Sequence, residues 1–235
     1  MKFVSVVQHT SADYLGLMED HLEGRGIRFK YFRPFTEAQP LPNPYEVGDA
    51  LILLGGGPWG TAGTRNLPTL DRELTLVHAC MMLNKPIIGI ELGAQLLALG
   101  AGGGSSTQPL TIDVGYATRT RDDALDGFLP PRFPLVSYMR DLPQPPDYAR
   151  VLAVDDQGRP ALFQIGETYF GFTGHPGFKV AIAEYLIMEF EESPSNNSQS
   201  LERLRGMKKE IEDALVPIMT GIIKLTGLMD ISSHS

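Results

Sequence analysis

Short apolar runs separated by amphipathic segments fill the first hundred residues of the chain. Residues 2–7 (KFVSVV), 49–54 (DALILL) and 86–90 (PIIGI) have the length and composition of buried strands. Residues 27–33 (IRFKYFR) alternate apolar and charged positions, as a half-buried strand does. The pattern therefore predicts four strands in this part of the chain.

Helical periodicity occupies most of the sequence between these strands. Apolar residues recur at helical spacing within residues 11–26 and 67–85, and GAQLLALG (93–100) follows the last strand as a further helix. Short apolar strands that alternate with helices are typical of a parallel sheet covered on both faces. We therefore predict an α/β fold with an open, mostly parallel sheet.

Residues 110–175 differ from the preceding segments, because they contain many prolines, short strands and hairpin signals. We expect them to form a small antiparallel insertion or edge of the same domain. A further helix is predicted at 181–190, and the polar, breaker-rich residues that follow it are typical of a linker. The predicted organisation is a domain over 1–193, a linker over 194–200 and a helical extension over 201–235.

The extension has the spacing of a heptad repeat. Its repeat positions alternate intervals of three and four, and all but Lys208 are apolar: Leu201, Leu204, Lys208, Ile211, Leu215, Ile218, Ile222, Leu225 and Met229. Because the repeat is short, we expect a helix that packs on the body of the protein or on a second copy of the chain, and not a long free coiled coil. Pro217 should kink or divide this helix, since it removes a backbone donor.

Composition and charge describe an ordinary globular protein, with 43% hydrophobic and 20% charged residues in a chain of 235. The net charge of −8 and the absence of clustered Lys and Arg argue against a nucleic-acid partner. The lone cysteine, Cys80, excludes an internal disulfide and suits a reducing compartment. No signal-length apolar stretch begins the chain, and Pro217, Gly221 and Lys224 interrupt the most apolar later segment. We therefore expect a cytoplasmic protein with no membrane association.

Candidate chemistry begins at GIELGAQLLA, which starts at Gly89 and follows a predicted strand. Gly89, Glu91 and Gly93 form the pattern G-x-E-x-G, which is the sequence form of a nucleophile elbow between a strand and a helix. Small flanking residues tolerate the strained backbone of such a turn, and the amides that follow it favour negative charge. Taken alone, the pattern is equally compatible with a turn that exposes an incidental glutamate.

Two further turns follow predicted strands. GGGPWG (55–60) is glycine-rich, and its amides can face a developing oxyanion, although a tight turn also requires glycine. GHPG (174–177) contains His175, which is flanked by residues that hold a loop rigidly. Carboxyl ends of parallel strands meet at one edge of a sheet, where sites collect.

Together and in this order, the three elements resemble the class I glutamine amidotransferase family over roughly residues 1–193. In that family a G-x-C-x-G-x-Q elbow supplies a nucleophilic cysteine, a GGP loop supplies an oxyanion amide, and an H-P-E motif supplies the histidine and acid of a triad. The resemblance implies an open, flavodoxin-like α/β fold.

The resemblance also assigns roles to residues outside the triad. It implies that the amides of Gly57 and Leu92 form an oxyanion hole beside Gly56, and that Gln95 lines the substrate pocket. Trp59 would cover the pocket as an apolar wall, although a packing role is at least as compatible with its position.

Two of the three triad positions depart from the family. Glu91 stands in place of the cysteine and Gly177 in place of the acid, whereas His175 is retained. A carboxylate is far less nucleophilic than a thiolate, so ordinary glutaminase chemistry should be absent. Cys80 lies within a predicted helix and is typical of a small buried apolar residue. An engineered replacement of the catalytic cysteine alone would leave the triad acid in place. Gly177 therefore argues against Glu91 being such an engineered substitution.

Two functions remain open. In the first, which we favour slightly, Glu91 acts as nucleophile or general base, with His175 as acid and base, on a C–N bond of a small amide or γ-glutamyl conjugate. In the second, the Glu91 carboxylate occupies its own pocket, and the protein is an inactive binding, regulatory or complex-forming subunit. We expect no cofactor and no metal site, since one His beside one Glu supplies too few ligands. The predicted partners are an amide or amino-acid-like small molecule, and a second copy or a synthase bound through the C-terminal helix.

Overall fold

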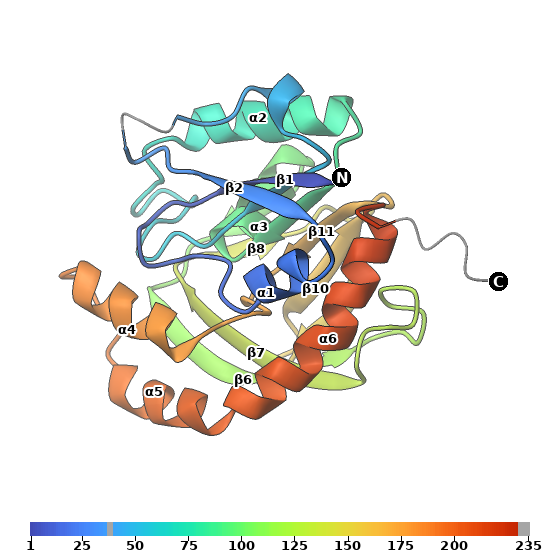
Figure 1. Cartoon of the computed structure of the whole chain (residues 1–235). Helices are drawn as coiled ribbons and strands as arrows, with labels where there is room; N and C mark the ends of the chain where they lie inside the picture. The colour runs from blue at the N-terminus through green and yellow to red at the C-terminus, as the bar shows by residue number, and fades with distance from the viewer. Residues whose placement is uncertain (37–39, 230–235) are drawn as a thin grey trace.

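A nine-stranded sheet with helices on both faces forms the centre of the structure, a computed structural model that describes residues 1–36 and 40–229 (Figure 1). Its strand order is β2-β1-β3-β4-β11-β10-β9-β6-β7. These strands are β1 (Phe3–Val7), β2 (Arg28–Phe32), β3 (Ala50–Leu53), β4 (Ile87–Ile90), β6 (Thr111–Arg119), β7 (Arg132–Met139), β9 (Arg150–Asp155), β10 (Pro160–Ile165) and β11 (Tyr169–Phe172). The helices are α1 (Met18–Glu23), α2 (Leu70–Met82), α3 (Leu92–Gly100), α4 (Val180–Glu189), α5 (Asn197–Gly206) and α6 (Lys208–Leu225), with a 3-10 turn at Pro44–Glu46.

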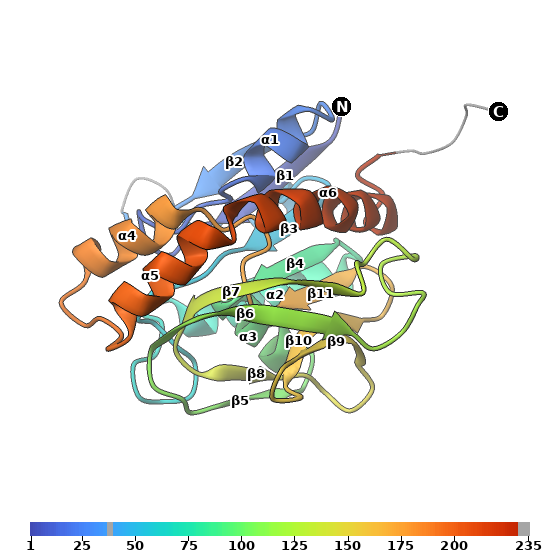
Figure 2. The same ribbon diagram turned by 90° about the horizontal axis from the view of Figure 1, so that it is seen from below.

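The parallel half of the sheet comprises β2, β1, β3, β4 and β11. Every residue of β3 and β4 is buried, because α2 and α3 cover one face while α1 and α6 cover the other (Figure 2). Leu76 and Leu97 belong to the hydrophobic cluster on the face covered by α2 and α3. Met18 and Ile222 belong to the hydrophobic cluster on the face covered by α1 and α6. The predicted mostly parallel α/β sheet is confirmed.

The antiparallel half extends the same sheet. β10, β9, β6 and β7 follow β11 and pair antiparallel with their neighbours. A separate two-stranded sheet joins β5 (Gly104–Ser106) to β8 (Leu142–Gln144). Residues 111–165 therefore form the antiparallel edge of the sheet, as their hairpin signals predict, whereas β11, in the same predicted segment, pairs parallel with β4 at the centre of the sheet.

The first predicted helix is much shorter in the structure. The sequence predicts a span of 11–26, but α1 comprises only Met18–Glu23, and residues 11–17 form a loop. Gly16 has φ +61°, outside the helical region, and an added Cβ there would lie 2.2 Å from the carbonyl oxygen of Gly177. Close packing of these two backbone segments therefore prevents the helix from starting earlier.

The C-terminal segments also begin and end at positions that the sequence did not predict. α5 starts at Asn197, so the last four residues of the predicted linker are helical. The break between helices falls at Met207, while α6 runs through Pro217 without division. Pro217 lacks the donor that would bond the carbonyl of Asp213, a residue that is itself exposed. The remainder of the predicted extension, residues 230–235, lies outside the described residues.

The heptad positions of α6 pack on the body of the protein. Leu215, Ile218 and Ile222 are at most 2% exposed and belong to the same cluster as Phe133 and Leu152 of the sheet. A partner bound through this helix stays a prediction, since these apolar positions are already buried within the chain. Neither α6 nor any other helix among the described residues is long and apolar enough to cross a membrane.

Replacing Ile218 by alanine should lower the free energy of unfolding by about 2 to 5 kcal/mol, because it deletes buried methyl groups and leaves a cavity. Val216, on the outer side of the same helix, is 51% exposed, and its replacement by alanine should change stability by less than about 0.5 kcal/mol. Urea unfolding followed by circular dichroism measures both values. Equal effects of the two substitutions would contradict the packing of α6 on the sheet.

Candidate functional site

A strained elbow joins β4 to α3, as the G-x-E-x-G pattern predicts. Glu91 has φ 53° and ψ −108°, a conformation that residues other than glycine rarely adopt. Both flanking glycines are required by packing. An added Cβ would lie 2.3 Å from the Gly93 carbonyl oxygen at Gly89, and 2.0 Å from the Leu53 carbonyl oxygen at Gly93. The two glycines thus have a structural role whatever the chemistry of the elbow.

The Glu91 side chain points into the protein and is fully buried. Its Oε1 accepts a hydrogen bond of 2.8 Å from the backbone N–H of Tyr138 in β7. Its Oε2 receives no hydrogen bond from an N–H or hydroxyl donor of the described residues. One half of the carboxyl group is therefore fixed by the sheet and the other half needs a different partner.

That partner is Asp13, from the loop between β1 and α1. Asp13 is also fully buried, and neither of its carboxyl oxygens receives such a donor from the described residues. An added Cβ at Gly55 would lie 2.0 Å from Asp13 Oδ2 and 2.1 Å from Glu91 Oε2, which places these two oxygens side by side. Two buried carboxylates cannot both be charged at such a distance, so the pair must hold a proton.

Burial raises the pKa of Glu91 well above its usual range, and the Asp13 carboxyl beside it raises it further. Burial also raises the pKa of Asp13, to about 7, although His9 and the hydrogen bond from Glu91 oppose this shift. The directions indicate that Glu91 keeps the proton and donates it to Asp13. A protonated carboxyl donor and a carboxylate acceptor satisfy both otherwise unpaired oxygens.

A buried ion pair lies on the other side of the same glycine. His9 Nδ1 donates to the carbonyl oxygen of Gly55 (3.0 Å), and His9 Nε2 lies 2.7 Å from Glu73 Oε2. Burial disfavours the charged imidazole, but Glu73, the Gly55 carbonyl oxygen and Asp13 together oppose it, so the pKa of His9 is raised. Thr69 donates to the second oxygen of Glu73. His9 is therefore a buried cation whose charge also favours an anionic Asp13.

His175 is held by the backbone and is hydrogen bonded at both ring nitrogens. Its Nε2 donates to the carbonyl oxygen of Tyr14 (2.7 Å), and its Nδ1 accepts from the N–H of Gly177 (3.1 Å). Burial lowers the pKa of His175 to about 4, so the ring is neutral near pH 7. The His175 N–H donates to Val136 of β7, two residues before Tyr138, whose N–H binds Glu91. In this arrangement neither nitrogen is available to Glu91.

The space around the third triad position is filled. An added Cβ at Gly177 would lie 2.9 Å from both Cγ and N of Met18, and 3.1 Å from the carbonyl oxygen of Leu15. A longer acidic side chain could not enter without displacing the start of α1. The glycine is thus part of a close contact between two segments.

The residues assigned to the oxyanion hole lie together. Gly56 and Leu92 are in contact, since an added Cβ at Gly56 would lie 2.3 Å from Leu92 Cδ2. Gly57 has φ +55° and packs toward Phe190 and Leu186. All three predicted residues are buried, so the glycine-rich loop packs on the elbow and covers it.

Gln95 is fully buried, and its amide group is used inside the protein. Its Nε2 donates to the carbonyl oxygen of Arg140 (2.7 Å), and its Oε1 accepts from the Thr61 hydroxyl (2.7 Å). These bonds tie α3 to the glycine-rich loop and to the corner after β7. In this conformation Gln95 joins protein segments.

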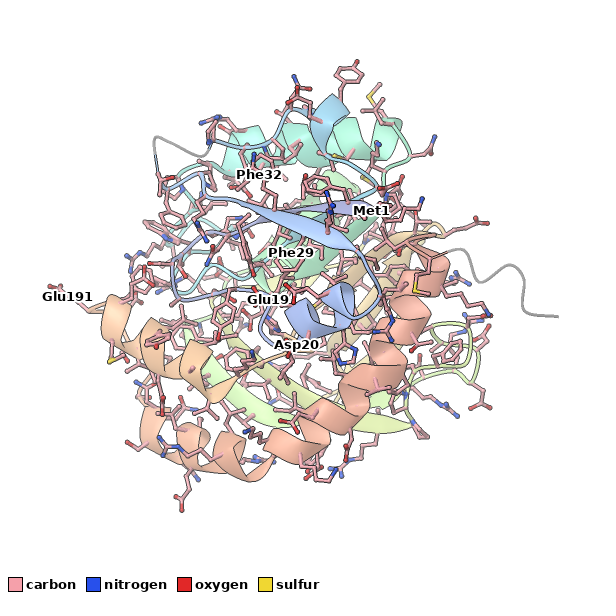
Figure 3. All side chains as sticks on the ribbon, viewed as in Figure 1. Met1, Glu19, Asp20, Phe29, Phe32 and Glu191 are labelled. Atoms are coloured by element: carbon pink, nitrogen blue, oxygen red, sulfur yellow. The ribbon has the colours of Figure 1, made fainter. Side chains whose placement is uncertain are left out.

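Ionic contacts hold the loop over the site. Asp141 Oδ2 accepts from the N–H groups of Thr61 and Ala62, each at 2.9 Å. Arg140 donates to the Pro58 carbonyl oxygen (2.9 Å) and pairs with Glu192, which follows α4. In Figure 3, Glu191, the neighbour of Glu192, lies on the side of the molecule where Phe32 ends β2, opposite to Met1. The segment after α4 therefore reaches the carboxyl edge of the parallel strands.

Trp59 is half-buried and contributes to the same cover. The guanidinium of Arg65 lies 4.6 Å from the centre of its ring, and Arg65 also pairs with Glu192 at 2.7 Å. The packing role of Trp59 is thus visible, whereas a substrate-facing role stays a prediction.

Sequence reasoning missed His9, Asp13 and Glu73. The predicted helix over 11–26 includes Asp13, and none of these three residues was among the candidate site residues. Their position in the sequence could have indicated His9 and Asp13, because residues 8–13 directly follow β1. The neighbouring parallel strand, β3, ends just before Gly55. Parallel neighbours bring their carboxyl ends to one edge.

Other candidate groups lie elsewhere. Cys80 is buried in α2, and burial raises the pKa of its thiol to about 11, so it remains protonated. Within residues 1–36 and 40–229, no group of three or more His, Cys, Asp or Glu side chains is arranged to hold a metal ion.

The carboxyl pair predicts a pH dependence of stability. Asp13 has a pKa of about 7 in the folded protein, against an ordinary value of 3.8, so folding takes up a proton between these values. Its stabilising contribution is complete below this range and declines as pH rises through it, by up to about 1.4 kcal/mol per pH unit. The free energy of unfolding of the wild type relative to Asp13→Asn should therefore fall between about pH 5 and pH 7.

Urea unfolding across this range measures the difference, and contributions common to both proteins, such as that of His175, cancel. Asp113→Asn alters an exposed carboxyl and should leave the pH profile unchanged. Parallel profiles for wild type and Asp13→Asn would contradict the raised pKa of Asp13.

The chain is similar to known proteins in sequence and in fold, although no family model matches it. The glutamine amidotransferase-like protein YfeJ of Salmonella typhimurium is 28% identical over 201 residues, which cover 80% of this chain and 81% of YfeJ. The glutamine-hydrolysing GMP synthase of Ignicoccus hospitalis has a subunit that is 31% identical over 147 residues, which cover 61% of this chain and 73% of that protein.

Solved structures show the same fold at lower identity. A glutamine amidotransferase from Methylobacillus flagellatus has a TM-score of 0.80 and 20% identity, covering 100% of this chain and 98% of the other. Another from Thermotoga maritima has a TM-score of 0.78 and 20% identity, covering 96% and 98%. Sequence relatives, the elbow and the sheet topology agree, and the chain belongs to the class I glutamine amidotransferase-like family.

Proposed function

We propose that this protein is a non-hydrolytic member of its family that serves as a binding, regulatory or complex-forming subunit. The buried carboxyl pair of Glu91 and Asp13 carries this proposal, because it occupies the position from which the family's cysteine would attack an amide. We favour here the second of the two functions left open by the sequence.

The protonation of Glu91 supports a non-nucleophilic role. A carboxyl group that holds a proton and donates it to Asp13 lacks the negative charge that makes a carboxylate nucleophilic. Its other oxygen already accepts from Tyr138. The side chain is also fully buried, so it has no open path to a substrate in this conformation.

The other two triad positions support the same proposal. His175 uses both ring nitrogens on backbone groups, and burial keeps its pKa near 4. Gly177 faces Met18 at a distance that excludes an acidic side chain. The three positions together lack a nucleophile, an available base and a residue to orient that base.

The retained glycines do not require a working site. Gly89 and Gly93 are needed for the packing of the elbow, and Gly56 for its contact with Leu92. Scaffold packing therefore accounts for the glycine pattern that, in the sequence alone, favours an enzyme.

An enzyme that acts on a C–N bond of a small amide or γ-glutamyl conjugate remains the second candidate, and one observation favours it. The elbow at Glu91 keeps its strained φ of 53°, and the pair with Asp13 holds one transferable proton, as a general acid needs. Such chemistry would require the loop held by Asp141 and the Arg140–Glu192 pair to open, and His175 to release Tyr14 or Gly177.

A partner role is supported by one relative. The Ignicoccus hospitalis protein is named as one subunit of GMP synthase. We extend to this chain only the general role, that of a domain that acts in a complex.

Replacing Glu91 by glutamine should leave catalysis unchanged, because there is none to lose. Wild type and Glu91→Gln should release equal background amounts of glutamate from L-glutamine and from γ-glutamyl amides, as measured by product mass. Glutamine can donate to Asp13 and accept from Tyr138, so the variant should fold and serves as its own structural control. Wild-type turnover that falls by about 100-fold or more in Glu91→Gln would overturn the proposal in favour of a catalytic Glu91.

Replacing Glu91 by alanine should open the space that the side chain fills. The N–H of Tyr138 then loses its acceptor and becomes available to a ligand carboxylate or carbonyl. Calorimetry should show L-glutamine or L-glutamate binding at least about tenfold more tightly to Glu91→Ala than to wild type or to Glu91→Gln. Equal binding by all three proteins would count against a side chain that fills its own pocket.

A further inference from the structure

A cavity of about 330 Å³ lies between the start of α4 and the junction of α5 with α6. We call it the seam cavity, since it lies between the predicted domain (residues 1–193) and the C-terminal extension (residues 201–235). Its walls are mostly apolar, with Leu17 and Phe178 from the body and Leu204 and Ile211 from the extension. The volume is at the lower end of the range for small-molecule sites.

Positive charge accompanies these apolar walls. Lys179 and Lys208 line the cavity, and neither forms an ion pair within the part of the chain that the structure describes. Lys179 is half-buried and Lys208 is exposed. Glu212 is the acidic residue of the lining, so the lining carries a net positive charge.

We infer that the seam cavity binds a small amphipathic carboxylate, with its apolar body between Phe178 and Ile211 and its charged end at Lys179 and Lys208. An inorganic anion would leave the apolar walls uncovered, and a neutral apolar molecule would leave the net positive charge of the lining unbalanced. Each buried methylene of such a ligand contributes about 0.8 kcal/mol. A medium-chain carboxylate satisfies both features of the cavity.

The seam cavity adjoins the loop that holds His175. The ring of Phe178 meets the ring of His175 edge-on, with 5.7 Å between their centres. Lys179 Nζ lies 5.9 Å from the ring centre of Tyr14, whose carbonyl accepts from His175. A ligand in the seam cavity therefore touches residues that position the closed site. The inference does not rest on the absence of catalysis, because binding is measured directly.

Isothermal calorimetry with octanoate on the full chain tests the inference, with octyltrimethylammonium as a probe of equal chain length and opposite charge. Octanoate should bind with one-to-one stoichiometry and at least about tenfold more tightly than the cation. Lys208→Glu should weaken octanoate binding by about tenfold or more. Lys209→Glu is the matched control, because Lys209 pairs with Asp213 outside the lining, and it should leave binding unchanged.

A second variant tests the cavity itself. Ala181 lines the cavity and is half-buried, so Ala181→Phe should fill the space without disturbing a buried core, and should abolish octanoate binding at an unchanged melting temperature. Absence of octanoate binding to wild type up to about millimolar concentration would overturn the inference, as would equal binding of the cation. Octanoate binding that survives both Lys208→Glu and folded Ala181→Phe would show adsorption elsewhere and would also overturn it.

Discussion

The proton held between Glu91 and Asp13 is the interaction on which the closed site depends. Both carboxyl groups are fully buried, and without that proton two adjacent anions would lie in a space with one backbone donor, the N–H of Tyr138. With it, the elbow, the loop after β1 and strand β7 are joined at one point. Gly55 makes the contact possible, since any side chain there would collide with both carboxyl oxygens.

Close backbone packing explains why a family pattern can persist without the family's chemistry. Gly89 and Gly93 allow α3 to lie against β4 and β3, and Gly177 allows the histidine turn to lie against Met18. The same contacts that stabilise the sheet edge also remove the space for a triad acid. Asp141 and the Arg140–Glu192 pair then fix the glycine-rich loop over the elbow. Glycines in such a motif are therefore evidence for the fold and not, by themselves, evidence for catalytic activity.

The strands, the elbow and the antiparallel edge could be predicted from the sequence because each has a local signature of period, turn residues and length. The span of α1 could not, since the periodic residues between Tyr14 and Leu22 continue across Gly16, whose backbone is set by contact with Gly177. The division of the C-terminal helices was misplaced for a similar reason. Pro217 leaves the carbonyl of Asp213, an exposed residue, without its helical donor, and the helix continues through it.

By itself the sequence determined the family, the order of the elements and the identity of the residue at the elbow, because these depend on neighbours along the chain. Only the tertiary structure decided the chemical state of that residue. The pKa of Glu91 is raised by burial and by Asp13, which is 78 positions away in sequence and approaches across the end of a different strand. The same holds for His175, whose ring nitrogens are engaged by the backbone of Tyr14 and Gly177. Protonation depends on the groups that surround a side chain in space, and that arrangement is a property of the fold.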